Sequence, residues 1–201
     1  METVLSTPLQ EDEIRGLHTG DTIYVSGLMF TARDDAHHVL LDAAATGTAL
    51  PIDPGEMALF HCGPVVEQKD GVWHVVSAGP TTSARMEMFE ANFLDRFRTR
   101  LIIGKGGMGA QTLEALKRVG AVYTHFTGGA GALAARAVQR VPAVHWLDEL
   151  GIPEAVWIFE VDRFGPLTVT MDAHGKSLYD ELAVTVNANL EAIHARMEEE
   201  A

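Results

Sequence analysis

Gly79-Pro80-Thr81-Thr82-Ser83-Ala84-Arg85-Met86 is the stretch of sequence around which the predicted fold is arranged. Pro80 disfavours the α region for the residue before it, and the hydroxyl groups of residues 81–83 can cap free N–H groups at a helix start. Apolar side chains then recur at helical spacing, at Met86, Phe89, Phe93 and Phe97. We therefore expect a helix that begins within residues 81–83 and carries Arg85 one turn beyond Thr81 on the same face. A hydroxyl, free backbone N–H groups and a guanidinium gathered there can hold an anion.

Strand and helix patterns alternate on both sides of this stretch. Alternating apolar residues over 23–29 predict a strand. A helical pattern begins at about Arg33 and runs to about residue 45, with Asp34 or Asp35 as its cap. Asp70-Gly71 between two apolar runs indicates a hairpin. Further strands are expected at 101–103, 121–126, 141–146, 154–161 and 167–171, and helices at 11–17, at 111–119 and in a closing amphipathic segment marked by Val186, Leu190, Ile193 and Met197. This order predicts the α/β class, and because no repeat or linker divides the chain we expect a single domain over residues 1–201.

The composition and charge limit the partners of the chain. At 201 residues, 47% of them hydrophobic, it can bury a substantial core, and its formal charge of −13 argues against nucleic acid or an anionic membrane as partner. A small anionic ligand is still allowed, because salt screens the overall charge beyond about 8–10 Å and local cations then dominate. No apolar run reaches the length of a membrane span, and the acidic start lacks the apolar core of a signal peptide. We expect a cytoplasmic protein.

Cys62 is the one cysteine in the sequence. A single thiol rules out an intrachain disulfide and any zinc or iron–sulfur site built from thiolates of this chain alone, because such sites need several. Its apolar neighbours predict a small buried side chain rather than a reactive thiol. We therefore expect no metal site within the chain.

The glycine-rich segment 104–109 comes directly after a short apolar strand and precedes a helix. Its glycines satisfy the pattern G-x-G-x-x-G, which is typical of dinucleotide sites. The acidic residue expected about 20 positions later is missing, with no Asp or Glu between Glu114 and Asp148, and there is no Lys-Ser or Lys-Thr of the kind that a Walker A loop requires. The prediction that remains is that Lys105 lies at a helix N-terminus and can bind a carboxylate or phosphate.

Arg33, Arg85 and Lys105 lie at three separate junctions between a predicted strand and a predicted helix. If these junctions share one edge of the sheet, the three cations form a pocket that suits a small dicarboxylate. A guanidinium can hold a carboxylate through two hydrogen bonds, and a lysine can stabilise charge that develops during a reaction. The alternative is that Arg33 and Asp34 simply pair on the surface, as such dipeptides usually do.

Several motifs, in the right order, resemble the β subunit of class I fumarases and L-tartrate dehydratases. They are Ser26-Gly27, Thr31-Ala32-Arg33-Asp34-Asp35-Ala36-His37, the stretch from Gly79 to Met86, Ile103-Gly104-Lys105-Gly106, Glu154-Ala155-Val156-Trp157 and Asp172-Ala173-His174-Gly175. The resemblance covers nearly the whole chain. Two departures are mild: Glu87 stands where many members have aspartate, and Asp35 where alanine is more usual.

The resemblance implies a swivelling three-layer β/β/α domain, with a mixed sheet and flanking helices, that acts as a hydro-lyase only together with a partner. In the family, a separate α subunit or domain holds a [4Fe–4S] cluster through three cysteines, and the reaction adds or removes water across a carbon–carbon double bond. The expected reaction is hydration of fumarate to (S)-malate, with dehydration of L(+)-tartrate to oxaloacetate as the alternative. We also expect dimerisation through this domain or within the complex.

Carried onto matching positions, the resemblance implies two sets of site residues. Thr81 and Lys105 are the expected catalytic residues, and the expected substrate-binding residues are Arg33, Arg85, Thr82, Asp34 and His37. Thr81 is the implied base, although a threonine hydroxyl needs activation by nearby cations and helix N–H groups. A capping and substrate-binding role for Thr81 stays open, as does a supporting role for Asp34 and His37. The alternatives from other classes are a non-catalytic anion-binding module of the same fold and a nicotinamide dinucleotide protein.

Overall fold

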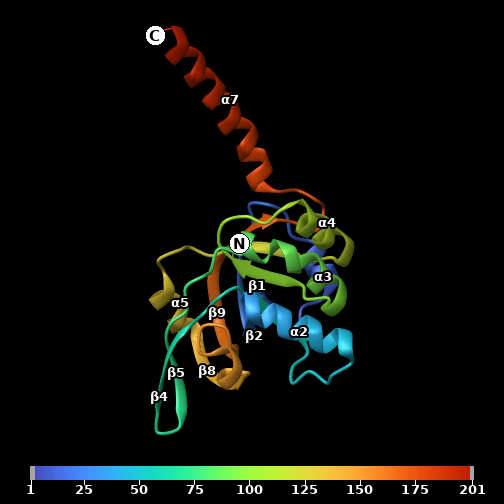
Figure 1. Ribbon diagram of the computed structural model, residues 1–201, viewed down its shortest axis with the longest axis vertical. Coiled ribbons are helices and arrows are strands. Elements are labelled where there is room, and N and C mark those ends of the chain that lie inside the picture. Colours follow the sequence, from blue (N-terminus) through green and yellow to red (C-terminus); the bar gives the residue numbers. More distant parts are fainter. Residues whose placement is uncertain (1–2, 200–201) are drawn as a thin grey trace.

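The computed structural model describes residues 3–199, in which strands and helices alternate along most of the chain (Figure 1). The strands are β1 Thr3–Ser6, β2 Thr22–Thr31, β3 Ala58–Phe60, β4 Val65–Lys69, β5 Val72–Ser77, β6 Leu101–Gly104, β7 Val122–His125, β8 Val138–His145 and β9 Val156–Met171. The helices are α1 Glu11–Arg15, α2 Asp34–Thr46, α3 Glu87–Phe97, α4 Ala110–Val119, α5 Gly131–Ala137, α6 Leu147–Leu150 and α7 Leu178–Glu199, with short 3₁₀ turns η1 Pro54–Glu56 and η2 Ser83–Met86. The predicted α/β class is confirmed.

Seven strands form one mixed sheet in the order β1-β2-β3-β6-β7-β9-β8, and β4 and β5 form the predicted hairpin. Strands β1, β2, β3, β6 and β7 are parallel to one another, whereas β9 runs antiparallel to β2, β7 and β8. Strand β9 pairs with both β7 and β2, so it connects the two ends of the parallel set β2-β3-β6-β7. The parallel strands end at the same edge of the sheet, where ligands usually bind in α/β proteins.

Hydrophobic cores fill the space on both sides of the sheet. Helices α2, α3 and α4 lie together on one side, and α5 and the β4–β5 hairpin lie on the other (Figure 1). Along β2, Met29 belongs to one core and its neighbour Phe30 to the other, and both are fully buried. The sheet is therefore covered on both faces, as the apolar character of this strand predicts.

The two strands expected at residues 154–161 and 167–171 are one long strand, β9. Phe164, Gly165 and Pro166 do not end it, although the register against β2 shifts nearby and Gly165 adopts a φ of +154°. Phe164 is fully buried, with its ring 5.2 Å from the rings of Phe60 and Phe126. Burial of this aromatic side chain holds the segment in the sheet, so tertiary packing outweighs the turn-forming residues.

The stretch 79–86 ends in the 3₁₀ turn η2, Ser83–Met86, rather than in the first turn of an α-helix. Thr82 is the N-cap of η2, its side chain makes no capping hydrogen bond within residues 3–199, and α3 starts only at Glu87. The suggestion that Thr81 is the N-cap is therefore wrong. The apolar face of α3 is confirmed, because Met86, Phe89 and Phe93 are buried.

The start of α2 also differs from the prediction. Its N-cap is Arg33, whose side chain makes no capping hydrogen bond, and the Asp35 N–H donates instead to Glu154 Oε2 at 3.2 Å. Both aspartates instead lie within the first turn, where negative charge is favourable to the helix dipole. Asp34 is consequently available to bind a group outside its own helix.

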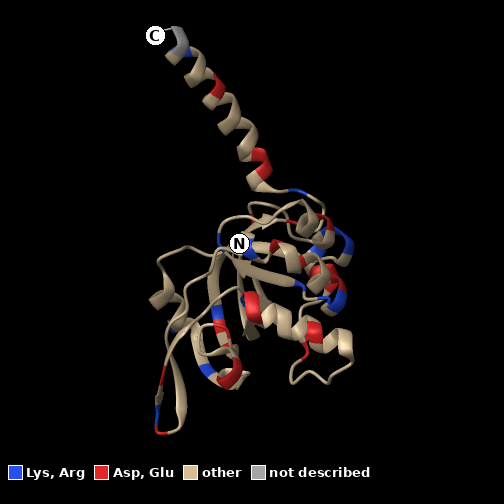
Figure 2. Ribbon diagram, in the orientation of Figure 1, with Lys and Arg blue, Asp and Glu red and all other residues tan. Residues whose placement is uncertain are grey.

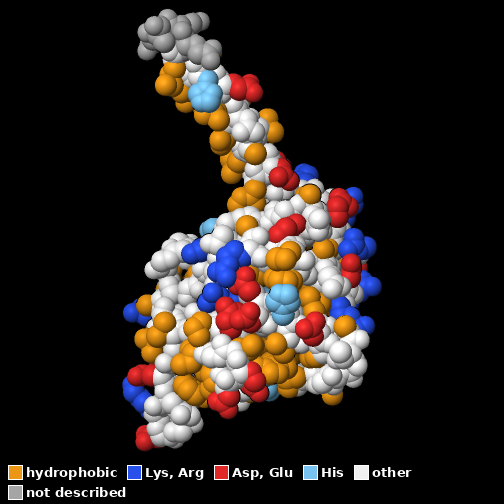
Figure 3. Space-filling view, in the orientation of Figure 1, with side chains coloured by type: hydrophobic (Ala, Val, Ile, Leu, Met, Phe, Trp, Pro, Cys, Tyr) orange, Lys and Arg blue, Asp and Glu red, His pale blue; other side chains and the backbone are white. Residues whose placement is uncertain are grey.

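Helix α7 projects away from the rest of the molecule (Figure 1). The predicted helix is confirmed, but its apolar residues are exposed: Val186 is 59%, Leu190 48%, Ile193 44% and Met197 64% exposed. Figure 3 shows hydrophobic side chains along its length, and Figure 2 shows acidic residues at its base and on the body. Among residues 3–199, no helix combines the length and the apolar content that crossing a membrane requires.

Candidate functional site

Three neighbouring parallel strands lead to the candidate site. Arg33 comes shortly after β2, His61 directly after β3, and Lys105 directly after β6. Because β2 pairs in parallel with β3, and β3 with β6, the three strand ends lie at one edge of the sheet. The structure thus confirms a shared edge for the junctions of Arg33 and Lys105, whereas the strand before Arg85 is β5, which belongs to the separate hairpin.

Residues 79–86 run across this edge and are held there by backbone hydrogen bonds. The Thr81 N–H donates to the His61 carbonyl at 2.7 Å, and the Ser83 N–H donates to the Lys105 carbonyl at 3.0 Å. Thr82 also forms an isolated parallel bridge with Lys105. These contacts fix Thr81 and Thr82 between the ends of β3 and β6.

Two of the three predicted cations are paired with carboxylates. Arg33 Nε lies 3.1 Å from Glu154 Oε1, and Arg85 Nη2 donates to Asp34 Oδ2 at 2.5 Å. The alternative in which Arg33 and Asp34 pair with each other is therefore wrong. The Lys105 side chain has no ion-pair or hydrogen-bond partner in the described part of the chain. The structure thus gathers Arg33, Arg85, Asp34 and Lys105 near residues 79–86, and leaves the lysine free to bind an anion.

Two glycines allow the close approach of these segments. A Cβ at Gly63 would lie 2.7 Å from Arg33 Nη1, and a Cβ at Gly104 would overlap Ser83 Oγ. The first glycine of the G-x-G-x-x-G pattern is thus explained by the packing of Ser83, without a nucleotide.

The N-terminus of α4, where a dinucleotide phosphate would bind, already holds a carboxylate. Glu87 Oε2 accepts hydrogen bonds from the Gly109 N–H at 2.6 Å and the Thr112 hydroxyl at 2.7 Å, and Glu87 Oε1 accepts one from the Thr112 N–H at 3.3 Å. The anion that this helix start attracts is therefore supplied by the chain itself. This arrangement weighs against the dinucleotide alternative. It also gives Glu87 a structural role, which is to bind the N–H groups at the start of α4.

The candidate site is open to solvent. Thr82 and Arg85 are exposed, and Thr81, Arg33 and Lys105 are partly buried. The Arg85 side chain is 52% exposed, against 22% for Arg33, so the two guanidinium groups lie at different depths. A surface hollow of about 580 Å³, whose lining includes Val39, His145 and Trp146, contains none of the predicted site residues.

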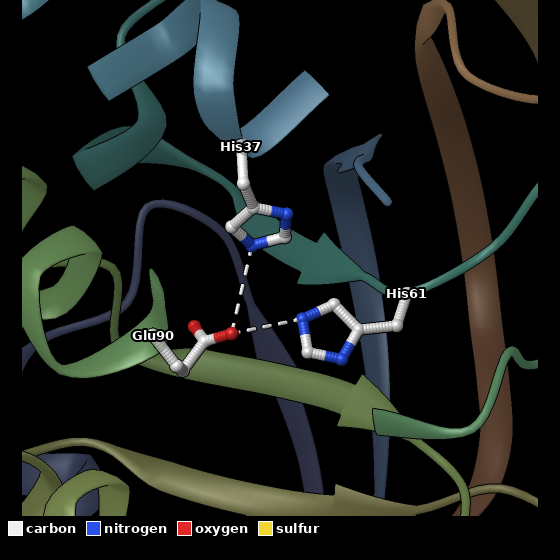
Figure 4. A group of neighbouring side chains, drawn as sticks. All are labelled: His37, His61 and Glu90. Carbon is white, nitrogen blue, oxygen red and sulfur yellow. Dashed lines mark ion pairs between the residues drawn. The ribbon is translucent and has the colours of Figure 1, made fainter. Parts of the chain in front are cut away.

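A buried polar cluster lies beneath the open edge and was not predicted as a unit. His37 from α2, His61 after β3 and Glu90 from α3 point toward one another and are all fully buried (Figure 4). Glu90 Oε2 lies 3.1 Å from His61 Nε2 and 3.5 Å from His37 Nε2. His37, expected to bind substrate, is therefore inside the protein rather than on the exposed edge. Glu90 could have been noticed, because it interrupts the apolar face of α3 between Met86 and Phe93.

The charges within this cluster depend on burial and on the contacts. Burial raises the pKa of Glu90, but His61 and His37 beside it outweigh this effect and lower the pKa to about 2. Burial lowers the pKa of His61, against the opposing influence of Glu90. Glu90 is thus an ionised carboxylate, and His61 favours the neutral form.

The residues that could ligate a metal or cofactor can be assessed directly. His37, His61 and Glu90 offer three candidate ligand atoms within 4.8 Å of one another. Cys62 is 1% exposed as predicted, and burial raises the pKa of its thiol. A buried thiol with a raised pKa is a poor ligand, and one cysteine cannot hold an iron–sulfur cluster.

Comparisons with known proteins now define the class of the chain. The family model described as "Fumarase C-terminus" matches residues 1–182. The chain is 40% identical over 181 residues to the L(+)-tartrate dehydratase subunit beta of Escherichia coli (strain K12), covering 90% of this chain and 88% of the relative. It is 41% identical over 179 residues to a Geobacillus stearothermophilus protein provisionally named a class I fumarate hydratase, covering 89% of this chain and 34% of that longer protein.

These matches define a class in which the same domain occurs both as a separate β subunit and as part of a longer chain. The chain belongs to the fumarase C-terminus family, as a relative of class I fumarases and tartrate dehydratase β subunits. The family resemblance inferred from the motifs is confirmed.

Proposed function

We propose that this chain is the β subunit of a hydro-lyase that interconverts fumarate and (S)-malate in a site shared with an α subunit. The observation that carries the proposal is the convergence of Arg33, Arg85, Lys105 and Thr81 on one open edge of the sheet. A small dianion needs cations at more than one position, and this edge offers them at different depths. Membership in the fumarase C-terminus family supports the reaction class.

The two arginines and the lysine have separate roles in the proposed site. Arg33 and Arg85 bind the two substrate carboxylates, each guanidinium being able to form two parallel hydrogen bonds. Asp34 holds Arg85 in place through its 2.5 Å contact, and Thr82 borders the substrate. Lys105, which has no side-chain partner in residues 3–199, stabilises negative charge that develops on the substrate during proton removal.

Thr81 is the proposed base that takes a proton from the substrate carbon. Its backbone N–H is engaged by the His61 carbonyl, while its hydroxyl has no hydrogen-bond partner in the part of the chain that is described. An alcohol is a weak base at neutral pH, so the proposal requires that Lys105 and Arg85 lower the pKa of the hydroxyl. Thr81 would then return the proton in the reverse direction.

The iron–sulfur cluster that the family resemblance implies does not fit the residues of this chain. Cys62 is alone in the sequence and buried, so we assign the cluster to the partner subunit. Held there, the cluster would supply a Lewis acid for the substrate hydroxyl. The residues of this chain bind, orient and deprotonate the substrate.

The open edge is the surface that we propose the α subunit covers. Arg85 is half exposed and Thr82 exposed, whereas charge stabilisation in an active site is strongest once water is excluded. A swivelling movement of the β subunit relative to the α subunit would open and close this site. The chain alone would therefore be inactive.

A second candidate is dehydration of L(+)-tartrate. The relatives that this chain matches over nearly their full length include tartrate dehydratase β subunits, whereas the fumarate hydratase relative is a longer chain. Tartrate and malate differ by one hydroxyl, and recognising an added hydroxyl needs a polar partner at the matching position. The α subunit can supply that partner as well as this chain can.

The test is an assay of the complex reconstituted anaerobically with its cluster-bearing α subunit. Fumarate, (S)-malate and both tartrate enantiomers are offered side by side, with the β chain alone as control. Turnover of fumarate and malate by the complex, and not by the β chain on its own, supports the proposal. Turnover of L(+)-tartrate only would favour the second candidate, and turnover of none would leave a non-catalytic anion-binding module.

Arg85→Ala is expected to lower kcat/KM for the preferred substrate by about two to three orders of magnitude, because a carboxylate in a desolvated site loses its charged partner. The matched control is Arg118→Ala, since Arg118 is 53% exposed and also pairs with an aspartate, Asp95. Steady-state kinetics of both variants in the reconstituted complex measure the difference. A kcat/KM for Arg85→Ala within about threefold of wild type would place the substrate elsewhere.

Thr81→Ser is expected to retain much of the activity and Thr81→Ala very little, because serine keeps the hydroxyl that the proposed base requires. The comparison uses kcat in the reconstituted complex, with thermal unfolding as a check on folding. Equal losses in both variants would show that the methyl group and packing matter, and that the hydroxyl does no chemistry.

A further inference from the structure

The buried cluster of His37, His61 and Glu90 has no part in the proposed function so far, yet it touches each segment that carries that function. His37 Nδ1 lies 2.7 Å from the carbonyl oxygen of Arg33, at the start of α2. His61 Nδ1 lies 2.9 Å from Ser83 Oγ, inside the turn that carries Thr81 and Arg85. Glu90 lies between the two rings (Figure 4). The cluster therefore links three separate parts of the chain.

The partner of Nδ1 fixes the position of one proton on His37. A carbonyl oxygen can only accept, so His37 Nδ1 must carry a proton and donate to Arg33. Its Nε2 lies 3.5 Å from Glu90 Oε2. His37 is thus held between the Arg33 carbonyl and the Glu90 carboxylate.

The hydrogen bonds of His61 continue into a second buried chain. The Tyr123 hydroxyl lies 3.0 Å from Ser83 Oγ and 3.1 Å from the Gly106 carbonyl oxygen, which can only accept. The Ser83 hydroxyl can donate to His61 Nδ1, which leaves the proton on His61 Nε2 facing Glu90. In this arrangement His61 is neutral, as its lowered pKa favours.

We propose that Glu90 is a positioning residue for the hydro-lyase reaction, acting through His37 on Arg33 and through His61 and Ser83 on the turn that carries Thr81 and Arg85. This inference rests on the proposed function. Glu90 itself is fully buried and does not touch the substrate edge.

The residues that contact Glu90 also hold the backbone of the site, which supports a positioning role. The His61 carbonyl accepts the Thr81 N–H at 2.7 Å while the His61 ring binds Ser83, and the Ser83 N–H in turn donates to the Lys105 carbonyl at 3.0 Å. A rotation of the His61 ring would therefore be felt at both Thr81 and Lys105. Small displacements of groups that meet the reacting atoms have large effects on rate.

Stability by itself does not explain the cluster. Three ionisable side chains inside a core cost desolvation energy, and a buried ion pair is often no more stable than apolar residues of similar size. A polar network does fix the orientation of its members, because each donor needs a particular acceptor. The position of the cluster, directly under the candidate site, gives that orientation a use.

A bound metal is the competing explanation for two histidines and one carboxylate. Both Nδ1 atoms have partners that could support metal-bound imidazoles. The 3.1 Å separation of His61 Nε2 and Glu90 Oε2 does not decide between the two explanations, because two ligands of one ion lie about as far apart and neither atom has hydrogen-bond geometry within the described residues. The positioning role belongs to the ion-free, proton-linked network, and metal analysis of the chain tests it.

The test compares Glu90→Gln, Ser83→Ala and the double variant in the reconstituted complex. Glutamine keeps the volume of Glu90 and removes its charge, and Ser83→Ala removes the hydroxyl that contacts His61 Nδ1 while leaving the three residues of the cluster unchanged. The matched control is Thr99→Val, which deletes a fully buried hydrogen bond of 2.9 Å to the Pro54 carbonyl, outside the network. All assays are run well below the unfolding midpoint of each variant.

We expect Glu90→Gln and Ser83→Ala each to lower kcat about tenfold or more with KM changed less than about threefold, and Thr99→Val to change kcat less than about threefold. Because Glu90 reaches the turn through His61 and Ser83, a path that Ser83→Ala also breaks, the double variant should lose less than the product of the two single losses. Unchanged kcat in Ser83→Ala and in folded Glu90→Gln, or strictly multiplicative losses, would overturn the inference. An inactive wild-type complex would instead reject the proposed function, so the two failures are distinguishable.

Metal analysis of the purified full chain completes the test. We expect less than about 0.1 equivalent of any divalent metal in the wild type, because the network needs no ion. One equivalent that is lost in Glu90→Gln would replace the proton-linked network with a metal site and overturn the inference.

Discussion

Helices α3 and α7 present the same kind of sequence pattern and have opposite surroundings. In α3 and the turn before it, Met86, Phe89 and Phe93 lie on one face and are no more than 9% exposed. In α7, Val186, Leu190, Ile193 and Met197 also recur at helical spacing and are 44% to 64% exposed. The period of apolar residues thus indicates a helix and its apolar face, but it does not tell whether the rest of the chain covers that face.

The difference arises from the elements that surround each helix in space. Strands β3 and β6 are neighbours in the sheet, and α3 lies between them in sequence. The pairing of the two strands therefore holds α3 against the sheet, where it also packs on α4. Helix α7 comes after the last strand, and the match to the family model ends at residue 182, near its start. Within residues 3–199, no element covers its apolar face.

Phe93→Ala should be the most destabilising of the substitutions that test this comparison. Phe93 is fully buried between α2 and the sheet, so its removal leaves a cavity and should lower the free energy of unfolding by about 3–5 kcal/mol. Urea unfolding measures the change, with the neighbouring Met88→Ala as control because Met88 is 77% exposed. A loss below about 1 kcal/mol for Phe93→Ala would mean that this face of α3 is not covered in solution.

Glu90, on the buried face of α3, should make the free energy of unfolding depend on pH. Its pKa is lowered to about 2 in the folded chain against an ordinary value of 4.5, so it stabilises the fold above about pH 4.5 and this contribution disappears as the pH falls toward 2. The shift corresponds to a difference on the order of 3 kcal/mol between ionised and protonated Glu90 in the fold, and not to a net gain over an apolar side chain. Glu90→Gln should therefore lower the unfolding free energy at pH 7 and differ progressively less from wild type below about pH 4.5.

Urea unfolding at neutral pH and at a series of acidic pH values down to about 3 checks this dependence. The control is Glu191→Gln on exposed α7, which should give the wild-type curve at every pH. A constant gap between Glu90→Gln and wild type across the series would mean that Glu90 is not an ionised partner of the histidines.

Ile193→Ala should have the smallest effect. Ile193 is 44% exposed on the uncovered face of α7, and alanine has the higher helix propensity, so the free energy of unfolding should change by less than about 0.5 kcal/mol. The same urea titration measures it, beside Phe93→Ala. A loss above about 1.5 kcal/mol would show that α7 is packed in solution.

The individual elements of the fold were largely predictable from local patterns. Period-two runs predicted β2, Asp70-Gly71 predicted the hairpin, and the apolar spacing predicted α3 and α7. The prediction failed where long-range packing decides the outcome. Burial of Phe164 carries β9 through a segment that has the sequence of a turn, and the capping residues of α2 and η2 are not those expected.

The site was predictable as a set of residue types but not as a network. Arg33, Arg85 and Lys105 could be chosen because cations at strand-to-helix junctions and the family motifs pointed to them. Their carboxylate partners, Glu154 and Asp34, come from distant segments and depend on the way these segments meet. Glu90 and His61 carry no local signal of pairing, since they are 29 residues apart in the numbering of the chain.

Local patterns along the chain were enough for the α/β class, the family and the cations that can bind a dicarboxylate, because periodicity and motifs involve residues close together in sequence. Which apolar faces are covered, and which polar groups meet inside, became known only from the folded chain, because burial and pairing depend on elements far apart in sequence. That is why two similar amphipathic patterns became a buried helix and an exposed one. It is also why a carboxylate on the buried helix became the centre of a polar cluster beneath the site.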